Sequence, residues 1–167
     1  MPTKSIYILF VCTGNTCRSP MAEALIRAEI KKYPALDGRI TVRSAGVFAA
    51  DGVPMSREAQ EALCAHGIDG ADHRSQPLDE AAMHAADLVL VMTSGHLDAV
   101  QSRFPDEAEK THILAAYADG VSDETAGSAY DLSDPYGGDQ RVYEQSLREI
   151  RAAIRQLVER MASAPKQ

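Results

Sequence analysis

A cysteine and an arginine lie six positions apart in one short loop near the N-terminus, Cys12-Thr-Gly-Asn-Thr-Cys-Arg-Ser19. The loop follows an apolar run and precedes a helix-forming run, and such a junction presents converging backbone N–H groups that bind anions. These groups and the Arg18 guanidinium favour a thiolate at Cys12. The pattern therefore predicts displacement at a phosphoryl group, with Cys12 as nucleophile, Arg18 on the phosphoryl oxygens and the Ser19 hydroxyl donating to the sulfur.

Three other interpretations of this loop stay open at the level of residue types. A free cysteine is most often a small buried hydrophobe. The Cys12–Cys17 pair also suits a fragment of a metal site, but no His or Cys cluster follows at ligand spacing, so we expect no metal. The loop is also compatible with phosphate binding without catalysis. The combination of cysteine, arginine and flanking elements favours catalysis.

A displacement of this kind also needs an acid that protonates the leaving group. Asp134 is the candidate that its context favours, because Asp134-Pro-Tyr-Gly-Gly lies in a long polar stretch, 119–139, just before the last expected helix. Pro135 restricts Asp134 to extended backbone geometry, and Tyr136 is placed to form a wall of the pocket. The same residues also suit an ordinary Asp-Pro turn, and residue types alone leave both interpretations open.

Hydrophobic periodicity predicts the elements that position these residues. Residues 6–11 form an apolar, β-branched run typical of a buried strand, and Pro20 followed by strong helix formers predicts a helix to about residue 33. We expect further strands at 39–43, 87–92 and 112–116, a short helix opened by 75–77, and helices at 57–67, 95–103 and 140–161. This alternation predicts a single-domain α/β fold with a four-stranded parallel sheet and helices on both faces. Ligands bind at the carboxyl ends of such strands, where Cys12 lies.

The composition of the chain limits the class of protein. Its 167 residues and 45% hydrophobic content suit one domain, expected at 1–162 with a frayed tail at 163–167. The net charge of −7 argues against nucleic-acid binding.

No secretory signal is recognisable, and no apolar run approaches the roughly 18 residues that span a membrane. Three cysteines do not make a disulfide framework, so we expect a reducing, cytoplasmic location. We also expect a monomer.

Three segments of the chain resemble those of the low-molecular-weight protein tyrosine phosphatases. Cys12 to Ser19 resembles the phosphate loop of the family, and Asp134-Pro-Tyr resembles its general-acid loop. Ser44-Ala-Gly46 resembles the segment whose serine braces the loop asparagine, here Asn15. The similarity runs from Ile6 to about Leu157, and it implies the low-molecular-weight phosphatase fold.

The resemblance also implies a mechanism and a set of site residues. Cys12 would form a cysteinyl-phosphate intermediate, Arg18 would clamp the phosphoryl group, and Asp134 would act first as acid and then as base. No metal or cofactor is implied, and the substrates would be phosphorylated proteins or peptides. The residues implied to bind phosphate or substrate are Thr13, Gly14, Asn15, Thr16, Cys17, Ser19 and Tyr136.

Two departures from the commonest tyrosine-directed pattern resemble the protein-arginine phosphatase branch of the family. Thr16 stands where an aliphatic residue is frequent, and Thr93 where an aspartate is frequent. A threonine hydroxyl can hold a water or the leaving nitrogen, and a guanidinium leaving group departs protonated. We therefore expect phosphoarginine hydrolysis, with phosphotyrosine hydrolysis by the same mechanism as the alternative, in which Thr16 is a tolerated substitution.

The remaining cysteines and histidines give weaker indications. A Cys12–Cys17 disulfide would block the nucleophile reversibly, so the enzyme would be redox-sensitive; the alternative is that Cys17 packs the helix start. We expect Cys64 to pack in the core, and we assign no role to His66 or His73. Arsenate reduction would need a cysteine pair later in the chain, and a non-catalytic reader of phosphoresidues would not need the nucleophile and the acid together.

Overall fold

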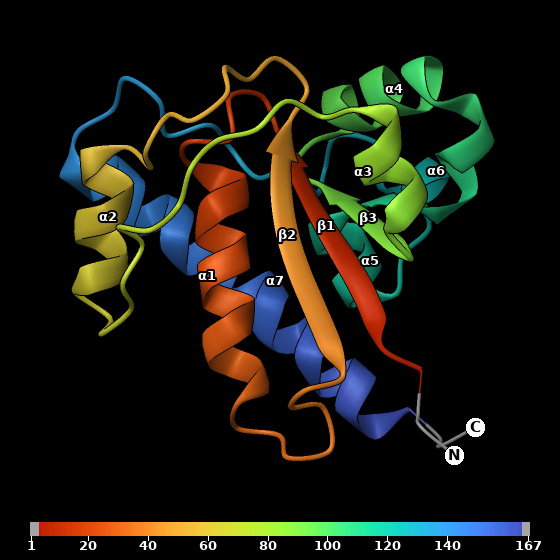
Figure 1. Cartoon of the computed structure of the whole chain (residues 1–167), viewed down its shortest axis with the longest axis horizontal. Helices are drawn as coiled ribbons and strands as arrows, with labels where there is room; N and C mark the ends of the chain where they lie inside the picture. The colour runs from red at the N-terminus through yellow and green to blue at the C-terminus, as the bar shows by residue number, and fades with distance from the viewer. Residues whose placement is uncertain (1–3, 165–167) are drawn as a thin grey trace.

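A computed structural model of the protein describes residues 4–164 and contains one parallel sheet (Figure 1). Its strands are β1 (Ile6–Cys12), β2 (Ile40–Gly46), β3 (Leu88–Val91) and β4 (Thr111–Ile113), in the order β2-β1-β3-β4. The expected four-stranded parallel sheet is therefore confirmed. The chain leaves β1 towards β2 on one side and later returns to β3 on the other, which makes the carboxyl end of β1 the switch point where ligands bind in such sheets.

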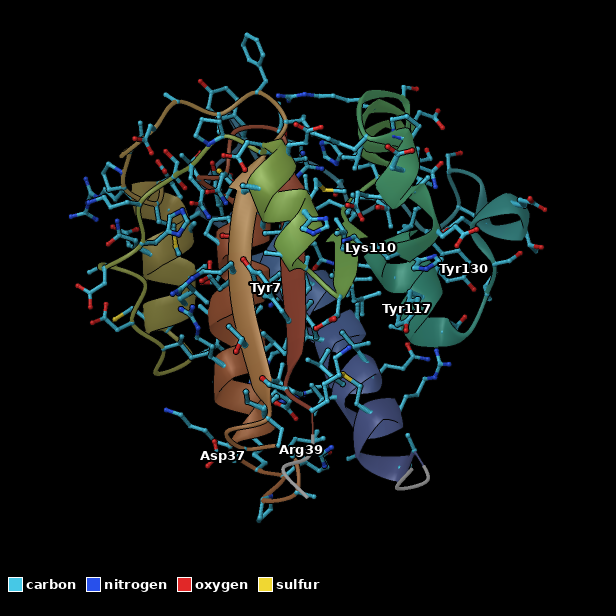
Figure 2. All side chains as sticks on the ribbon, turned by 45° about the vertical axis from the view of Figure 1, so that its right-hand side comes forward. Tyr7, Asp37, Arg39, Lys110, Tyr117 and Tyr130 are labelled. Atoms are coloured by element: carbon cyan, nitrogen blue, oxygen red, sulfur yellow. The ribbon has the colours of Figure 1, made fainter. Side chains whose placement is uncertain are left out.

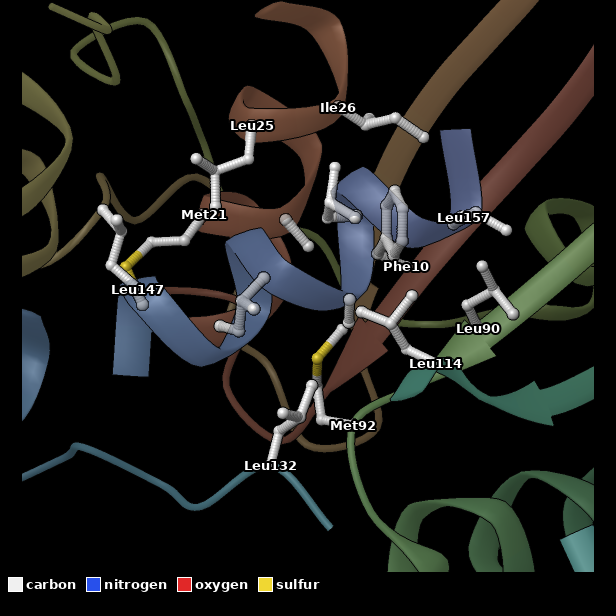
Figure 3. Close-up of a cluster of buried hydrophobic side chains, with 14 of the residues drawn as sticks. Phe10, Met21, Leu25, Ile26, Leu90, Met92, Leu114, Leu132, Leu147 and Leu157 are labelled. Carbon is white, nitrogen blue, oxygen red and sulfur yellow. The ribbon is translucent and has the colours of Figure 1, made fainter. Parts of the chain in front are cut away.

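Helices cover both faces of this sheet, as the alternation of strands and helices predicts. Even-numbered side chains of β1, such as Phe10, lie in a core with α1 (Arg18–Ile30), α2 (Arg57–Cys64) and α7 (Gln140–Ser163). Figure 3 shows Phe10 and Leu90 of the sheet in this core with Met21 and Leu25 of α1 and Leu147 and Leu157 of α7. Burial of these side chains is the main favourable contribution to folding.

The opposite face of the sheet carries the second core. Odd-numbered residues of β1, Leu9 and Val11, pack there with α3 (Glu80–Ala85) and α4 (Ser94–Arg103). Tyr7 is partly buried at the edge of the same cluster, and Figure 2 shows it on this side of the molecule. Asp37 and Arg39, labelled in Figure 2, lie at the end of the sheet where β1 and β2 begin. The phosphate loop lies at the other end, where both strands finish.

Two strands differ from the sequence-based prediction. β2 does not end at residue 43, because Ser44 to Gly46 pair in register with Phe10 to Cys12. The predicted fourth strand at 112–116 is also wrong in its second half: β4 ends at Ile113, and Leu114 begins α5 (Leu114–Asp119). Leu114 and Ala118 pack in one core and Ala116 in the other, whereas a strand would place all three on the same face.

The helices also differ at their ends. α1 begins at Arg18 rather than Pro20 and ends at Ile30, and the polar stretch 119–139 contains a short helix, α6 (Asp123–Ala126). Pro105–Lys110 forms a 3₁₀ helix after α4. α7 continues to Ser163, so the first residue of the expected tail belongs to the helix. Residues 165–167 of that tail lie outside the described residues. None of the helices within 4–164 is long and apolar enough to cross a membrane.

Candidate active site

The strand β1 delivers Cys12 directly into the loop that joins it to α1. The Cys12 side chain is buried, and its Sγ lies 2.9 Å from the Ser19 Oγ. Ser19 Oγ accepts a hydrogen bond of 2.8 Å from Asn15 Nδ2, and its own hydrogen has two acceptors in reach, the Cys12 sulfur and, at 3.5 Å, the Ala45 carbonyl oxygen. The shorter contact favours donation to the sulfur. A donor at this distance stabilises negative charge on the sulfur, which is what a thiolate nucleophile and leaving group needs.

Asn15 holds the loop in its bent form. It is fully buried and adopts a left-handed backbone with φ 55°, a conformation that asparagine tolerates better than most residues. Its Nδ2 also donates to Ser44 Oγ at 2.9 Å, and its Oδ1 accepts from the backbone N–H of Gln76 at 3.0 Å. His73, to which we assigned no role from the sequence, contacts the Asn15 carbonyl oxygen through Nε2 at 2.7 Å.

A buried carboxylate continues this network away from the cysteine. Ser44 Oγ donates to Glu23 Oε2 at 2.5 Å, and Arg27 Nη2 lies 2.6 Å from Glu23 Oε1. A chain of hydrogen bonds therefore runs from Glu23 through Ser44, Asn15 and Ser19 to Cys12. Nothing in the local sequence around Glu23 distinguishes it from Glu29, the other acidic residue of α1, because the partner of Glu23 lies on β2.

The arginine of the loop reaches across to the stretch before α7. Arg18 is 4% exposed, its Nη1 donates to the Leu132 carbonyl at 3.0 Å, and its Nη2 lies 3.4 Å from Asp134 Oδ2. The Asp134 side chain is half exposed and its Oδ1 accepts from the Tyr136 N–H at 3.1 Å. The structure thus brings Asp134 to the phosphate loop, while the Tyr136 side chain is 81% exposed at its rim.

Thr16 and Cys17 occupy different environments in the loop. Thr16 is partly buried, and its carbonyl accepts a hydrogen bond from the Ser56 N–H at 2.9 Å. Within 4–164 the only hydrogen-bond partner of its Oγ1 is the sulfur of Cys17, at 3.8 Å. The Cys17 sulfur lies 3.4 Å from the Tyr143 hydroxyl and 3.5 Å from Ser56 Oγ. Burial and this contact with Cys17 raise the pKa of Tyr143. The binding role expected for Thr16 and a Cys12–Cys17 disulfide both stay predictions.

The prediction for Cys64 is wrong, since this cysteine is exposed rather than packed in the core. The last turn of α2 places it on the solvent side, while Ala62 and Leu63 take the buried positions. His66 likewise lies away from the loop, between Arg151 and Glu144. Within the described residues no three His, Cys, Asp or Glu side chains gather in a way that holds a metal ion.

Sequence reasoning missed His96, the third residue of α4. Its Nε2 lies 2.9 Å from Thr13 Oγ1, and its side chain is almost fully buried. Burial, and then the nearby Arg18 guanidinium, lower the pKa of His96 to about 4. The one available signal was topological: α4 follows β3, whose carboxyl end lies next to that of β1.

Comparison with known proteins agrees with this geometry. The model of the family described as low molecular weight phosphotyrosine protein phosphatase matches residues 7–167. The chain belongs to this family. It is 43% identical over 154 residues to a protein-arginine-phosphatase of Geobacillus stearothermophilus, covering 92% of this chain and 95% of the relative. It is 42% identical over the same length to a protein-arginine-phosphatase of Bacillus subtilis, with the same coverage.

A solved structure shares the fold of this low-molecular-weight phosphatase. It is described as the YwlE arginine phosphatase, a cysteine-to-serine mutant with a phosphorylated active-site serine. The two chains superpose with a TM-score of 0.85 at 39% identity, over 95% of this chain and 97% of that one. The predicted family and fold are therefore both confirmed, and in this family member Asp134 comes from a distant part of the sequence to meet the loop that carries Cys12 and Arg18.

Proposed function

We propose that this protein hydrolyses phosphoarginine in phosphorylated proteins through a cysteinyl-phosphate intermediate. The observation that carries the proposal is the meeting of three groups at one loop: Cys12 with its sulfur 2.9 Å from Ser19, the buried Arg18, and Asp134 at 3.4 Å from that arginine. A nucleophile, an anion clamp and a proton donor in contact are what phosphoryl transfer to a side chain requires.

In the first step the Cys12 thiolate attacks phosphorus while Arg18 binds the equatorial oxygens. The bond between sulfur and phosphorus forms as the bond between phosphorus and the guanidino nitrogen breaks. The Asp134 carboxyl group gives its proton to that nitrogen, because a guanidine leaves as its protonated form. Half exposure leaves Asp134 free to meet the leaving group at the rim of the loop.

In the second step the same carboxylate activates a water molecule. Asp134 accepts a proton from the water as its oxygen attacks phosphorus, and the bond between sulfur and phosphorus breaks. The Ser19 hydroxyl donates to the departing sulfur, which leaves as a thiolate. Inorganic phosphate is released, and Cys12 and Asp134 return to their starting states, so no cofactor is consumed.

The preference for arginine rests on Thr16 and on the relatives named protein-arginine-phosphatases. The Thr16 hydroxyl offers a hydrogen-bonding group beside the loop, which suits a polar guanidino nitrogen better than a phenyl ring. Phosphotyrosine hydrolysis is the second candidate, and the specific observation in its favour is Tyr136. This exposed ring next to Asp134 offers an aromatic surface on which a phenyl group can stack.

We infer that the enzyme works as a cytoplasmic monomer on phosphorylated proteins, and not on nucleic acids or at membranes. The net charge of −7 supports this inference, because nucleic acids and anionic lipid surfaces attract basic proteins.

Trapping of the intermediate tests the proposed chemistry. The protein is mixed with a phosphoarginine peptide, quenched within milliseconds and digested, and the fragment that contains Cys12 is examined by mass spectrometry. We expect one added phosphoryl group on Cys12 in the wild-type protein, and slower formation of this intermediate in Asp134→Asn, which lacks the proton donor of the first step. Hydrolysis that persists in Cys12→Ser, or a phosphoryl group on another residue, would contradict the proposed mechanism. Cys64→Ser, which changes an exposed cysteine on α2, is the matched control.

A further inference from the structure

The Thr13–His96 contact has no part in the mechanism above, yet it joins the phosphate loop to α4. Thr13 directly follows Cys12 and its side chain is exposed at the rim, whereas the His96 side chain is 7% exposed. Their side chains meet at 2.9 Å through Thr13 Oγ1 and His96 Nε2. His96 Nδ1 is buried and has no hydrogen-bond partner within 4–164.

The unpartnered Nδ1 decides where the ring carries its hydrogen. In a neutral imidazole one nitrogen donates and the other accepts. A hydrogen on Nδ1 would be a buried donor without an acceptor, which is the rarer and costlier arrangement. A hydrogen on Nε2 instead donates to Thr13 Oγ1 and leaves only a bare lone pair unpartnered. This second tautomer leaves the Thr13 hydroxyl hydrogen free for another acceptor.

The surroundings hold the ring in place for this role. Thr93 caps α4 by accepting the His96 N–H at 3.1 Å, which fixes the first turn of the helix. The next residue, Ser94, donates its N–H to Asp131 Oδ1 at 2.7 Å, at the start of the stretch that carries Asp134. The first turn of α4 therefore contacts both the phosphate loop and the general-acid loop. This also gives a structural use to Thr93, whose hydroxyl caps the helix.

We propose that His96 is a positioning residue for phosphoryl binding: its Nε2–H donates to Thr13 Oγ1, and the Thr13 hydroxyl hydrogen is thereby left to donate to an oxygen of the bound phosphoryl group. The proposal rests on the proposed function, because it assigns the phosphoryl group to the loop between Cys12 and Arg18. The charged groups that face the ring are Arg18 of α1 and Asp131 and Asp134 of the stretch before α7. A bound phosphoryl dianion adds an acceptor at this place.

Nitrogen-15 NMR of histidine-labelled wild-type protein tests the tautomer directly. We expect His96 to carry its hydrogen on Nε2 at pH 7, before and after addition of inorganic phosphate. A hydrogen on Nδ1 would overturn the proposal, because Thr13 would then donate to the ring and have no hydrogen left for the ligand. This readout needs neither a variant nor turnover.

Inorganic phosphate binding by variants tests the consequence. Thr13→Val and His96→Leu should each weaken phosphate about three- to tenfold, as the loss of one hydrogen bond does, and the double variant should be no weaker than either alone. His96→Gln places an amide N–H close to the position of Nε2 and should retain most of the affinity. His84→Gln, an exposed histidine on α3, is the control that should change nothing.

The outcomes separate the two proposals. Additive losses in the double variant, or an unchanged affinity in a folded His96→Leu protein, would overturn the role of His96. If His96→Leu fails to fold, Thr13→Val, His96→Gln and the tautomer of the wild type still decide. Normal phosphate binding without hydrolysis of any phosphorylated peptide would remove the proposed function and leave the His96 result standing. A wild type that binds no phosphate would overturn both.

Discussion

Arg18 Nη2 lies 3.4 Å from Asp134 Oδ2, which joins the first loop of the chain to the segment before its last helix. The guanidinium is buried and is also fixed by the Leu132 carbonyl, whereas the carboxylate is half exposed. One partner of the pair is therefore held rigidly and the other is free to move. A fixed anion clamp beside a movable carboxyl group is the arrangement that both chemical steps require.

Replacement of Asp134 by Asn should separate proton transfer from binding. We expect kcat on a phosphoarginine peptide to fall about 10²- to 10⁴-fold, the usual contribution of a general acid or base. The affinity for inorganic phosphate should change little, because Arg18 and the loop remain. Steady-state kinetics measure kcat, and an NMR titration measures the affinity for inorganic phosphate. Asp98→Asn, an exposed carboxylate on α4, is the control, and an unchanged kcat in Asp134→Asn would contradict the role of this residue.

Thr16→Ile should shift the substrate preference towards phosphotyrosine. The change removes the hydroxyl that we propose to bind the guanidino nitrogen, and it adds an apolar surface that suits a phenyl ring better than a guanidino group. We expect the ratio of kcat/KM on phosphoarginine and phosphotyrosine peptides to fall at least about tenfold, which corresponds to about 1.4 kcal/mol. Thr16→Ser keeps the hydroxyl and should keep the preference. An equal loss on both peptides in Thr16→Ile would indicate damage to the loop instead.

Gly46→Ala should damage the phosphate loop from outside. An added Cβ at the end of β2 would lie less than 3.0 Å from both the Thr13 carbonyl oxygen and the Ala49 Cβ, closer than real contacts allow. The loop must therefore shift, and we expect weaker phosphate binding together with a lower melting temperature, since overpacking costs about 1–3 kcal/mol. Gly95→Ala is the matched control, because its added Cβ meets nothing closer than 3.7 Å.

The free energy of unfolding should decrease as the pH is lowered, because of the titration of His96. Its pKa in the folded state is about 4, below the ordinary value of 6.5, because burial and then Arg18 disfavour the charged ring. As the pH falls from about 6.5 to about 4, the unfolded chain takes up a proton that the folded protein does not, so the free energy of unfolding decreases. His96→Gln should lose this part of the pH dependence in urea titrations. A variant with the same pH profile as the wild type would show that folding does not lower the pKa of His96.

The parts of the site that follow one another in sequence could be predicted, and the parts that meet across the sheet could not. The roles of Cys12 and Arg18 could be predicted because the strand, the loop and the start of the helix that position them are contiguous in the sequence. Asp134 required the family resemblance, because residue types alone left an ordinary turn as an alternative. His96, Asp131 and Glu23 act through partners on other elements, and their local sequences carry no sign of them.

The fold follows the same rule. The alternation of buried strands and helices predicted the parallel sheet, since each strand buries both faces. The end of β2 was missed because Ser44 and Gly46 are poor strand formers, and pairing with β1 overrides that preference. The exposed position of Cys64 was missed because it depends on which residues of the last turn of α2 face the core.

The ratio of kcat/KM on two peptides of one sequence, carrying phosphoarginine or phosphotyrosine at the same position, tests the proposed function most directly. We predict that wild-type protein prefers the phosphoarginine peptide and that Cys12→Ser hydrolyses neither. A preference for the phosphotyrosine peptide in the wild type, with Thr16 unchanged, would contradict the assignment of arginine as the residue from which the phosphoryl group is removed.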